Sequence, residues 1–271
     1  MTRSGIFSAN ALWGDKNLTY ATSFLNEIKK SKYNNFYKID YTLNPLTISQ
    51  IINLWIEKNT QNNISNLLEK TKNYKFLTLS SAFYFRGIWL ASLHILDKSE
   101  VFNNVDGSMI QVSMMQQHFH YEYSENEYLR MLKLPYGRGE LAMAIILPKH
   151  NLSEVKEKLS ADDFSQLIAS AQNKDIMLRM PTFKVESTVD SLPKILSSMR
   201  LKSVTDNKEP WLSAGVQKVI IDVNNEGYDV ASSLDVGNKP LSYIVNKPFI
   251  FLVFDARSKA IVCMGQVLNL N

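Results

Sequence analysis

The side chains in this sequence that could bind a metal or act as a nucleophile are its histidines and its single cysteine. His118 and His120 stand two residues apart, so on a strand both side chains would share one face and could form half of a zinc site. Zinc needs three or four ligands, and neither His94 nor His150 has a partner close in the sequence. Cys263 lies in an apolar run, which is typical of a buried, inert thiol. We therefore expect neither a metal nor a cofactor.

The short motifs of the large enzyme classes are missing from the sequence. It contains no Gly-x-Ser-x-Gly elbow, no Walker loop, no Gly-x-Gly-x-x-Gly and no His-Glu-x-x-His. The sequence therefore predicts a protein that is not an enzyme.

Composition and charge also argue against nucleic acid and membrane partners. The 271 residues carry a formal net charge of +4, and the one tight basic cluster is Lys29, Lys30 and Lys32, which is typical of a solvated helix end. A nucleic-acid surface needs a denser basic stripe with aromatic residues. No apolar stretch approaches the roughly 20 residues of a membrane helix.

The cellular compartment is inferred from two further features. The N-terminal residues lack the apolar core of a signal peptide, and one cysteine cannot form an internal disulfide. Both favour the cytoplasm, with secretion as the alternative.

The hydrophobic pattern predicts a mixed α+β fold in one domain, residues 1–271. Residues 76–85 are apolar enough for a central strand covered on both faces. Thr47 and Gln50 have the spacing of a capping box, and residues 135–137 indicate a turn. Helices are expected at 22–30, 47–55, 65–68, 153–159, 161–171 and 192–199, and strands at 5–13, 34–41, 76–85, 112–123, 128–134, 141–147, 175–186, 216–223, 249–254 and 260–268.

Six segments, colinear over nearly the whole chain, resemble the serpin family of serine protease inhibitors. In order, they resemble helix F, strand 3 of sheet A, the paired strands of sheet B, strand 6 of sheet A, strand 5 of sheet A with the hinge, and the C-terminal hairpin. The segments are INLWIEKNTQNNISNLL (52–68), LTLSSAFYFRGIW (77–89), LKLPYGRGELAMAIILP (132–148), LRMPTFKVES (178–187), VQKVIIDVNNEGYDVASS (216–233) and KPFIFLVFDARSKAIVCMGQVLNL (247–270).

The resemblance implies a serpin-like α+β fold with a large central mixed sheet A, smaller sheets B and C, and peripheral helices. Serpins begin with several helices before the segment that resembles residues 5–13, whereas Met1 stands almost directly before it here. We therefore expect a truncated serpin that lacks the N-terminal helices. Its composition, rich in Lys, Asn and Ile, suits a viral, poxvirus-like protein that modulates its host.

The resemblance also implies a mechanism centred on an exposed reactive loop, residues 227–245. A serpin offers this loop as bait, and the protease cleaves it and forms an acyl-enzyme. The loop then inserts into sheet A as an extra strand and carries the protease with it. By resemblance, Trp89 lies in the breach at the upper end of sheet A, and the hinge consists of Asn225, Glu226, Gly227, Tyr228, Asp229, Val230 and Ala231.

Several hinge residues depart from the family pattern. Gly227 matches it, but Tyr228 and Val230 are larger than the small residues usual at their positions, and overfilling a packed site costs about 1–3 kcal/mol. Asn225 replaces an acid, and Gln217 replaces a histidine beneath the sheet. These departures weaken the case for an inhibitor.

The bait bond has three candidates. Counting forward from Gly227 selects Leu241–Ser242, and counting back from Asn246 selects Gly237–Asn238. The third candidate is Asp235–Val236, because some viral serpins present an acidic residue to caspase-like or granzyme-like proteases.

Two functions follow as expectations. The first is inhibition of a host serine or cysteine protease by loop insertion. The second is a non-inhibitory serpin-fold module that binds another protein. A homo-oligomer is one way to cover the sheet that the missing helices would leave exposed.

Overall fold

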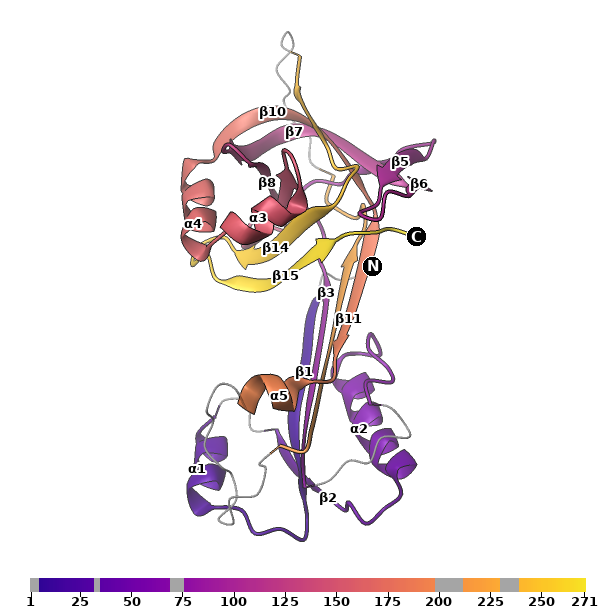
Figure 1. Cartoon of the computed structure of the whole chain (residues 1–271), viewed down its shortest axis with the longest axis vertical. Coiled ribbons are helices and arrows are strands. Elements are labelled where there is room, and N and C mark those ends of the chain that lie inside the picture. Colours follow the sequence, from indigo (N-terminus) through magenta and orange to yellow (C-terminus); the bar gives the residue numbers. More distant parts are fainter. Residues whose placement is uncertain (1–4, 32–34, 69–75, 198–211, 230–238) are drawn as a thin grey trace. The chain divides into compact units, whose positions relative to one another are not determined.

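The structure is a computed structural model that describes residues 5–31, 35–68, 76–197, 212–229 and 239–271 (Figure 1). These residues form two compact units. Unit 1 holds residues 87–185 and 222–271, and unit 2 holds residues 5–86 and 186–221. Each unit is considered by itself, and the single domain expected over residues 1–271 stays a prediction.

Unit 2 is built on a five-stranded sheet. Strand β3 (Leu77–Arg86) lies near its middle and pairs antiparallel with β1 (Gly5–Asp15). β1 also pairs in parallel with β2 (Phe36–Ile39). The order is β11-β12-β3-β1-β2, with β11 at Phe183–Val189 and β12 at Ala214–Val223. β12 therefore lies directly beside β3.

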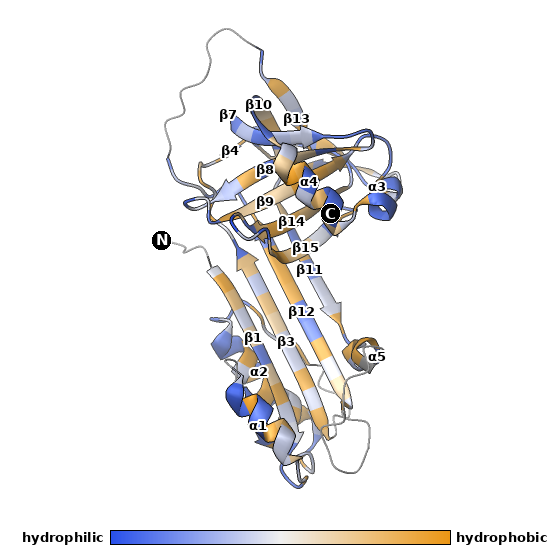
Figure 2. Cartoon of the chain, turned by 90° about the vertical axis from the view of Figure 1, so that its left-hand side faces the viewer, coloured by the Kyte–Doolittle hydropathy of each residue, from blue (hydrophilic) through white to orange (hydrophobic). Residues whose placement is uncertain are grey.

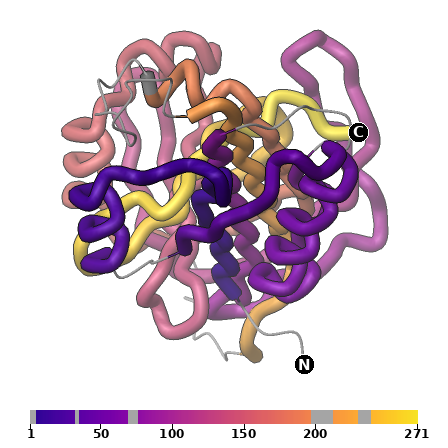
Figure 3. The backbone as a smooth tube through the Cα atoms, turned by 90° about the horizontal axis from the view of Figure 1, so that it is seen from below, coloured from indigo at the N-terminus to yellow at the C-terminus, as the bar shows by residue number. Residues whose placement is uncertain are grey.

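Helices lie on both sides of this sheet. α2 (Pro45–Asn59) lies on one side of β1 and α1 (Thr22–Lys30) on the other, as Figure 3 shows from below, and α5 (Leu192–Ser197) follows β11. Ile48, Ile52 and Ile56 recur at helical spacing along α2, and they pack into a core with residues of β1 and β3, among them Ala11 and Ala82.

The opposite face of the sheet is more open than we expected for a central strand. On β1, Ser8 and Asn10 are exposed, and on β3, Leu79, Ser81 and Phe83 are only half-buried. The prediction of β3 as a central strand is confirmed by the strand order, but cover on both faces is wrong for the described residues. The physical reason is that the apolar core under α2 packs against the face that carries Ala11 and Ala82, whereas Ser8 and Asn10 on the opposite face stay exposed.

The start of α2 differs from the predicted capping box at Thr47. Asn44 is the N-cap, and its side-chain oxygen accepts a hydrogen bond from the backbone N–H of Thr47 at 2.8 Å. Pro45 then occupies the first helical position, where its fixed φ and missing N–H are tolerated. The Asn-Pro pair therefore begins the helix three residues earlier than Thr47 would.

Replacing Asn44 by alanine is expected to lower the free energy of unfolding by about 1 kcal/mol, because the Thr47 N–H loses its acceptor. Urea denaturation would measure this loss. Gln50→Ala serves as the control and is expected to change stability by less than about 0.5 kcal/mol. Equal losses in the two variants would contradict this assignment of the cap.

The short helix expected at residues 65–68 is absent. Asn66 has a positive φ of 51°, which interrupts helical geometry. The Asn53 side chain instead bonds the backbone of Leu68 at both its N–H (2.8 Å) and its carbonyl (3.1 Å), so the buried segment needs no helix to satisfy these groups.

Unit 1 is built on an eight-stranded sheet. Its main path is β13-β10-β7-β8-β9-β14-β15, and β4 also pairs with β7. The strands are β4 (His94–Ile95), β7 (Met114–Glu125), β8 (Leu129–Tyr136), β9 (Leu141–Pro148), β10 (Gln172–Pro181), β13 (Leu241–Ile244), β14 (Phe249–Asp255) and β15 (Ile261–Val267). A small separate pair joins β5 (Glu100–Asn103) to β6 (Met109–Val112).

This sheet is apolar on both faces, and β9 and β14 are among its most hydrophobic strands in Figure 2. Helices α3 (Leu152–Lys158) and α4 (Ala161–Ser170) cover one face with Val155 and Phe164. The other face is covered by the sheet itself, which curls. Tyr243 on edge strand β13 donates a hydrogen bond to the Ile145 carbonyl on β9, although β10, β7 and β8 separate the two strands in the order.

The turn predicted at residues 135–137 begins later than expected. β8 continues through Pro135 and Tyr136, and the chain turns at Gly137 and Gly139, which have φ values of 54° and 88°. In the part of the chain that the structure describes, no helix is long and apolar enough to cross a bilayer.

Candidate functional site

The candidate hinge follows β12 and lies along residues 89–93. Four backbone hydrogen bonds join the two segments: Trp89 N to Glu226 O (2.8 Å), Tyr228 N to Trp89 O (3.2 Å), Ser92 N to Tyr228 O (3.0 Å) and Leu93 N to Asn225 O (3.1 Å). Trp89 and Gly227 form a parallel bridge within this contact. The first part of the hinge is therefore held like a short added strand.

Side chains strengthen the same contact. The Trp89 indole N–H donates to the Asn224 carbonyl at 2.6 Å, and the Asn225 amide donates to the Leu93 carbonyl at 3.3 Å. A carboxylate, which the family usually has in place of Asn225, could only accept hydrogen bonds and would face a carbonyl oxygen. The amide thus fits the local geometry that this chain adopts.

Gly227 sits where a side chain has no room. A Cβ built on it would lie 2.6 Å from the Ala91 carbonyl carbon and 2.5 Å from Ser92 Cα. Real Cβ atoms do not approach backbone this closely, and backbone cannot rotate away as a flexible side chain can. The glycine therefore permits the close approach of the two segments.

Gly227→Ala is expected to lower the free energy of unfolding by about 1–3 kcal/mol, because the segments must separate and strain their hydrogen bonds. Thermal or urea unfolding would measure the loss. Gly107→Ala is the control: it has open space around it and a φ of 86°, so only the backbone penalty of about 1 kcal/mol applies. In addition, hydrogen exchange at the Ser92 amide should accelerate in Gly227→Ala alone, and unchanged exchange would contradict the packing argument.

Trp89 is anchored from its other side by Tyr136. The two rings stack with centroids 4.1 Å apart and an interplanar angle of 12°, and Trp89 is only 2% exposed. The Tyr136 ring also fills the space beside Gly87, where a Cβ would collide with it.

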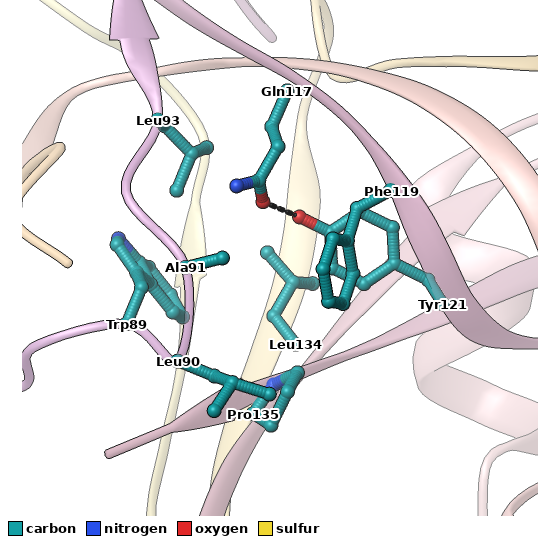
Figure 4. Close-up of a pocket in the computed structure, with 9 residues that line it drawn as sticks. All are labelled: Trp89, Leu90, Ala91, Leu93, Gln117, Phe119, Tyr121, Leu134 and Pro135. Atoms are coloured by element: carbon teal, nitrogen blue, oxygen red, sulfur yellow. Dashed lines mark hydrogen bonds between the residues drawn. The ribbon is translucent and has the colours of Figure 1, made fainter. Parts of the chain in front are cut away.

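A small pocket lies behind residues 89–93 (Figure 4). Leu93, Phe119 and Leu134 supply apolar walls. Gln117 is the polar group: its amide donates to the Ser92 carbonyl at 2.7 Å and its oxygen accepts from the Tyr121 hydroxyl. Gln117 thus ties the 89–93 segment to β7, and the pocket supports the segment rather than offering free polar groups.

The remaining candidate loop residues are only partly described. Tyr228 is 52% exposed and Asp229 is exposed. Val230, Ala231 and the candidate bonds Asp235–Val236 and Gly237–Asn238 lie outside the described residues. Leu241 and Ser242 begin β13, where they pair in parallel with Ile176 and Met177 of β10.

His118 and Cys263, which were candidates for metal binding and reactivity, have structural surroundings that explain them. His118 Nε2 lies 2.7 Å from an Asp175 carboxylate oxygen. Burial raises the pKa of the half-buried Cys263 thiol to about 12, so the unreactive protonated form dominates at neutral pH. Within the described ranges, no three His, Cys, Asp or Glu side chains gather as metal ligands.

Comparison with known proteins decides the family. The family model described as "Serpin (serine protease inhibitor)" matches residues 2–270. The chain belongs to the serpin family. An uncharacterized serpin-like protein of Thermococcus kodakarensis is 26% identical over 97% of this chain and 66% of its own length. Human Serpin B3 is 27% identical over 95% of this chain and 73% of its own length.

The fold is that of solved serpins. The crystal structure of uncleaved ovalbumin matches with a TM-score of 0.88, at 17% identity, over all of this chain and 79% of that one. The α+β fold with mixed sheets A, B and C is thereby confirmed. The chain spans about two thirds of the length of the first serpin-like relatives it matches. These relatives are archaeal, and others are animal, so a viral origin stays a prediction.

Sequence reasoning missed three residues of this serpin site. Tyr136, which stacks on Trp89, was interpreted as part of a turn. Asn224 accepts the Trp89 indole N–H through its backbone carbonyl, which every residue carries, and Gln117 bonds the Ser92 carbonyl through an amide that every glutamine carries, so their types gave no signal. Their position beside the Trp89 segment becomes visible only in the fold.

Proposed function

We propose that this serpin inhibits a serine or cysteine protease by offering its loop as bait and inserting it after cleavage, and that it is not an enzyme. The observation that carries the proposal is the course of the chain at Gly227. β12 lies next to β3 in a five-stranded sheet. The hinge continues from the end of β12 and bonds residues 89–93, so it does not form a strand of that sheet. If the chain reversed near Gly227, the loop would run back along β12 and could add a strand between β12 and β3.

Among the three candidate bonds, we favour Gly237–Asn238. A protease must wrap around several residues of extended backbone on both sides of the bond. Leu241 and Ser242 already pair with β10, so a bond between them is held in a sheet. Asp235–Val236 remains the alternative for a protease that prefers acidic residues.

The first test is thermal unfolding before and after limited proteolysis within residues 234–242. Inhibition by insertion predicts a large rise in the unfolding midpoint after cleavage, because the added strand pairs with both neighbours. The nicked protein should keep both fragments in a native gel. An unchanged midpoint with both fragments retained would refute insertion.

The second candidate function is a non-inhibitory serpin that binds a partner protein. The observation that favours it is Tyr228, whose large side chain would have to turn into the sheet at the start of insertion. A complex with a protease that survives denaturing gels would exclude this candidate.

A further inference from the structure

The last strand of unit 1, β15, stands at one end of its sheet. It pairs antiparallel with β14 on one side, and no strand in the described part of the chain pairs with its other side (Figure 1). The chain after β15 turns to residues 104–105, where Val105 N donates to the Leu268 carbonyl at 3.0 Å and Leu270 N donates to the Asn104 side chain at 2.9 Å. The outer edge of β15 therefore presents backbone N–H and carbonyl groups that have no partner strand.

The edge of β15 lacks the protection that the other sheet ends carry. Four strands end the strand orders of the two main sheets: β2, β11, β13 and β15. Charged side chains, proline and short length prevent an edge from pairing with another chain. β2 carries Lys38, and β11 carries Lys184 and Glu186. β13 has only 4 residues and follows Lys239 and Pro240. β15 has 7 residues, none of them charged and none a proline.

The side chains of β15 are apolar and partly open to solvent. Met264 is 63% exposed and Ile261 is 44% exposed. They lie opposite Leu252 and Phe254 of β14, and directly opposite residues share one face of a sheet. Leu252 and Phe254 belong to the core that α3 and α4 cover. The apolar surface of the sheet therefore continues beyond the helices onto β15, where covering it is favourable.

We propose that β15 pairs antiparallel with β15 of a second copy of this chain across a two-fold axis, so that the two sheets become continuous. A two-fold contact joins the same surface of both copies. It therefore covers both open edges at once, whereas a single foreign strand would leave its own outer edge open. Because β15 is uncharged, it can face its own copy without like-charge repulsion. The inference uses none of the hinge residues and is independent of the proposed protease inhibition.

The faces of the strand restrict how the two copies can pair. A register shift beside Val262 bends one end of β15, and residues 263–267 stay in regular register with β14. A two-fold axis perpendicular to the sheet keeps each side chain on its own face, so partners are the same residue or an even number of residues apart. An axis at Met264 meets this condition and brings the most exposed apolar side chains of the two strands together. Cys263 then lies opposite Gly265 of the second copy.

The size of the contact predicts its strength. One strand edge with a few side chains covers less than the roughly 1,200 Å² of a stable interface. We therefore expect a reversible dimer that dissociates in the micromolar range.

Sedimentation velocity over a concentration series measures this association. The wild type should pass from monomer to dimer in the micromolar range. Met264→Lys should raise the dissociation constant about tenfold or more, because it places two like charges opposite each other across the axis. Hydrogen exchange in residues 263–267 should slow as the wild-type concentration rises and should not change with concentration in the variant.

Met109→Lys is the matched control. Met109 is 72% exposed and lies on β6, in the separate two-stranded sheet of the same unit. The variant makes the same change of charge at an exposed methionine and should leave dimerisation unchanged. Both side chains are largely exposed, so both variants should keep the unfolding midpoint of the wild type at concentrations where all three proteins are monomers.

A disulfide tests the register directly. Met264→Cys combined with Cys263→Ser should form a disulfide between two copies under mild oxidation, because the two positions face each other across the axis. Met109→Cys in the same Cys263→Ser background should form it far more slowly.

Three results would overturn the proposal. The first is a chain that stays monomeric into the millimolar range. The second is a dimer that tolerates Met264→Lys or loses as much from Met109→Lys, because the contact would then lie elsewhere. The third is disulfide formation that is equally fast in the two cysteine variants.

Discussion

Trp89→Ala is expected to lower the free energy of unfolding by about 3–5 kcal/mol, the usual cost of removing a large buried aromatic side chain. Trp89 holds together three features at once: the stack on Tyr136, the indole bond to Asn224, and the backbone pairing with residues 226 and 228. Urea denaturation followed by circular dichroism would measure the loss. Limited proteolysis should also cut the variant within residues 224–229, which become free of the 89–93 segment.

Trp89→Phe is the informative control, because it keeps an aromatic ring against Tyr136 and loses the indole N–H. We expect a smaller loss, with about 1 kcal/mol of it from the hydrogen bond to Asn224. A loss below 1 kcal/mol in Trp89→Ala would contradict the anchoring role. Equal proteolysis of the wild type and the alanine variant would contradict it as well.

Tyr228→Thr is expected to accelerate loop insertion after cleavage by about 5–150-fold. Tyr228 is 52% exposed, so its removal costs the uncleaved protein little. In an inserted strand the side chain would have to be packed, at a cost of about 1–3 kcal/mol, and a barrier that felt this cost would slow insertion by the stated factor. The rate is measured by following the appearance of the species with the higher unfolding midpoint after proteolysis.

Tyr228→Phe separates size from polarity in this prediction. Phenylalanine has nearly the same volume and no hydroxyl, so insertion should stay as slow as in the wild type. If threonine and phenylalanine accelerated insertion equally, size would not be the obstacle. If neither variant gained stability on cleavage, the binding-module function would be favoured.

Much of the fold could be predicted because it depends on patterns that are local. The apolar run at residues 76–85 identified a central strand, and the C-terminal hairpin was predicted from its two apolar runs. The helix start at Asn44 was missed, although the Asn-Pro pair carried the signal. The helix at 65–68 was wrong because a distant side chain, Asn53, satisfies that backbone.

The candidate site was predictable only in part, for a different reason. Gly227 could be assigned by resemblance, and its need for space is explained by the backbone of Ala91 and Ser92. The partners of the hinge come from residues more than a hundred positions away, such as Leu93 and Trp89. Backbone pairing of this kind leaves no trace in residue types.

The open face of the five-stranded sheet in unit 2 bears on self-association. Its adjacent strands carry a row of hydroxyl and amide groups: the Asn10 amide donates to Ser8 at 2.8 Å, Asn10 lies opposite Ser81, and the Gln217 amide donates to Ser81 at 3.3 Å. The half-buried side chains of Leu79 and Phe83 lie on the same face, on either side of Ser81 along β3. A second molecule docking there would therefore have to satisfy the polar groups, directly or through interfacial water, while it buried these apolar side chains.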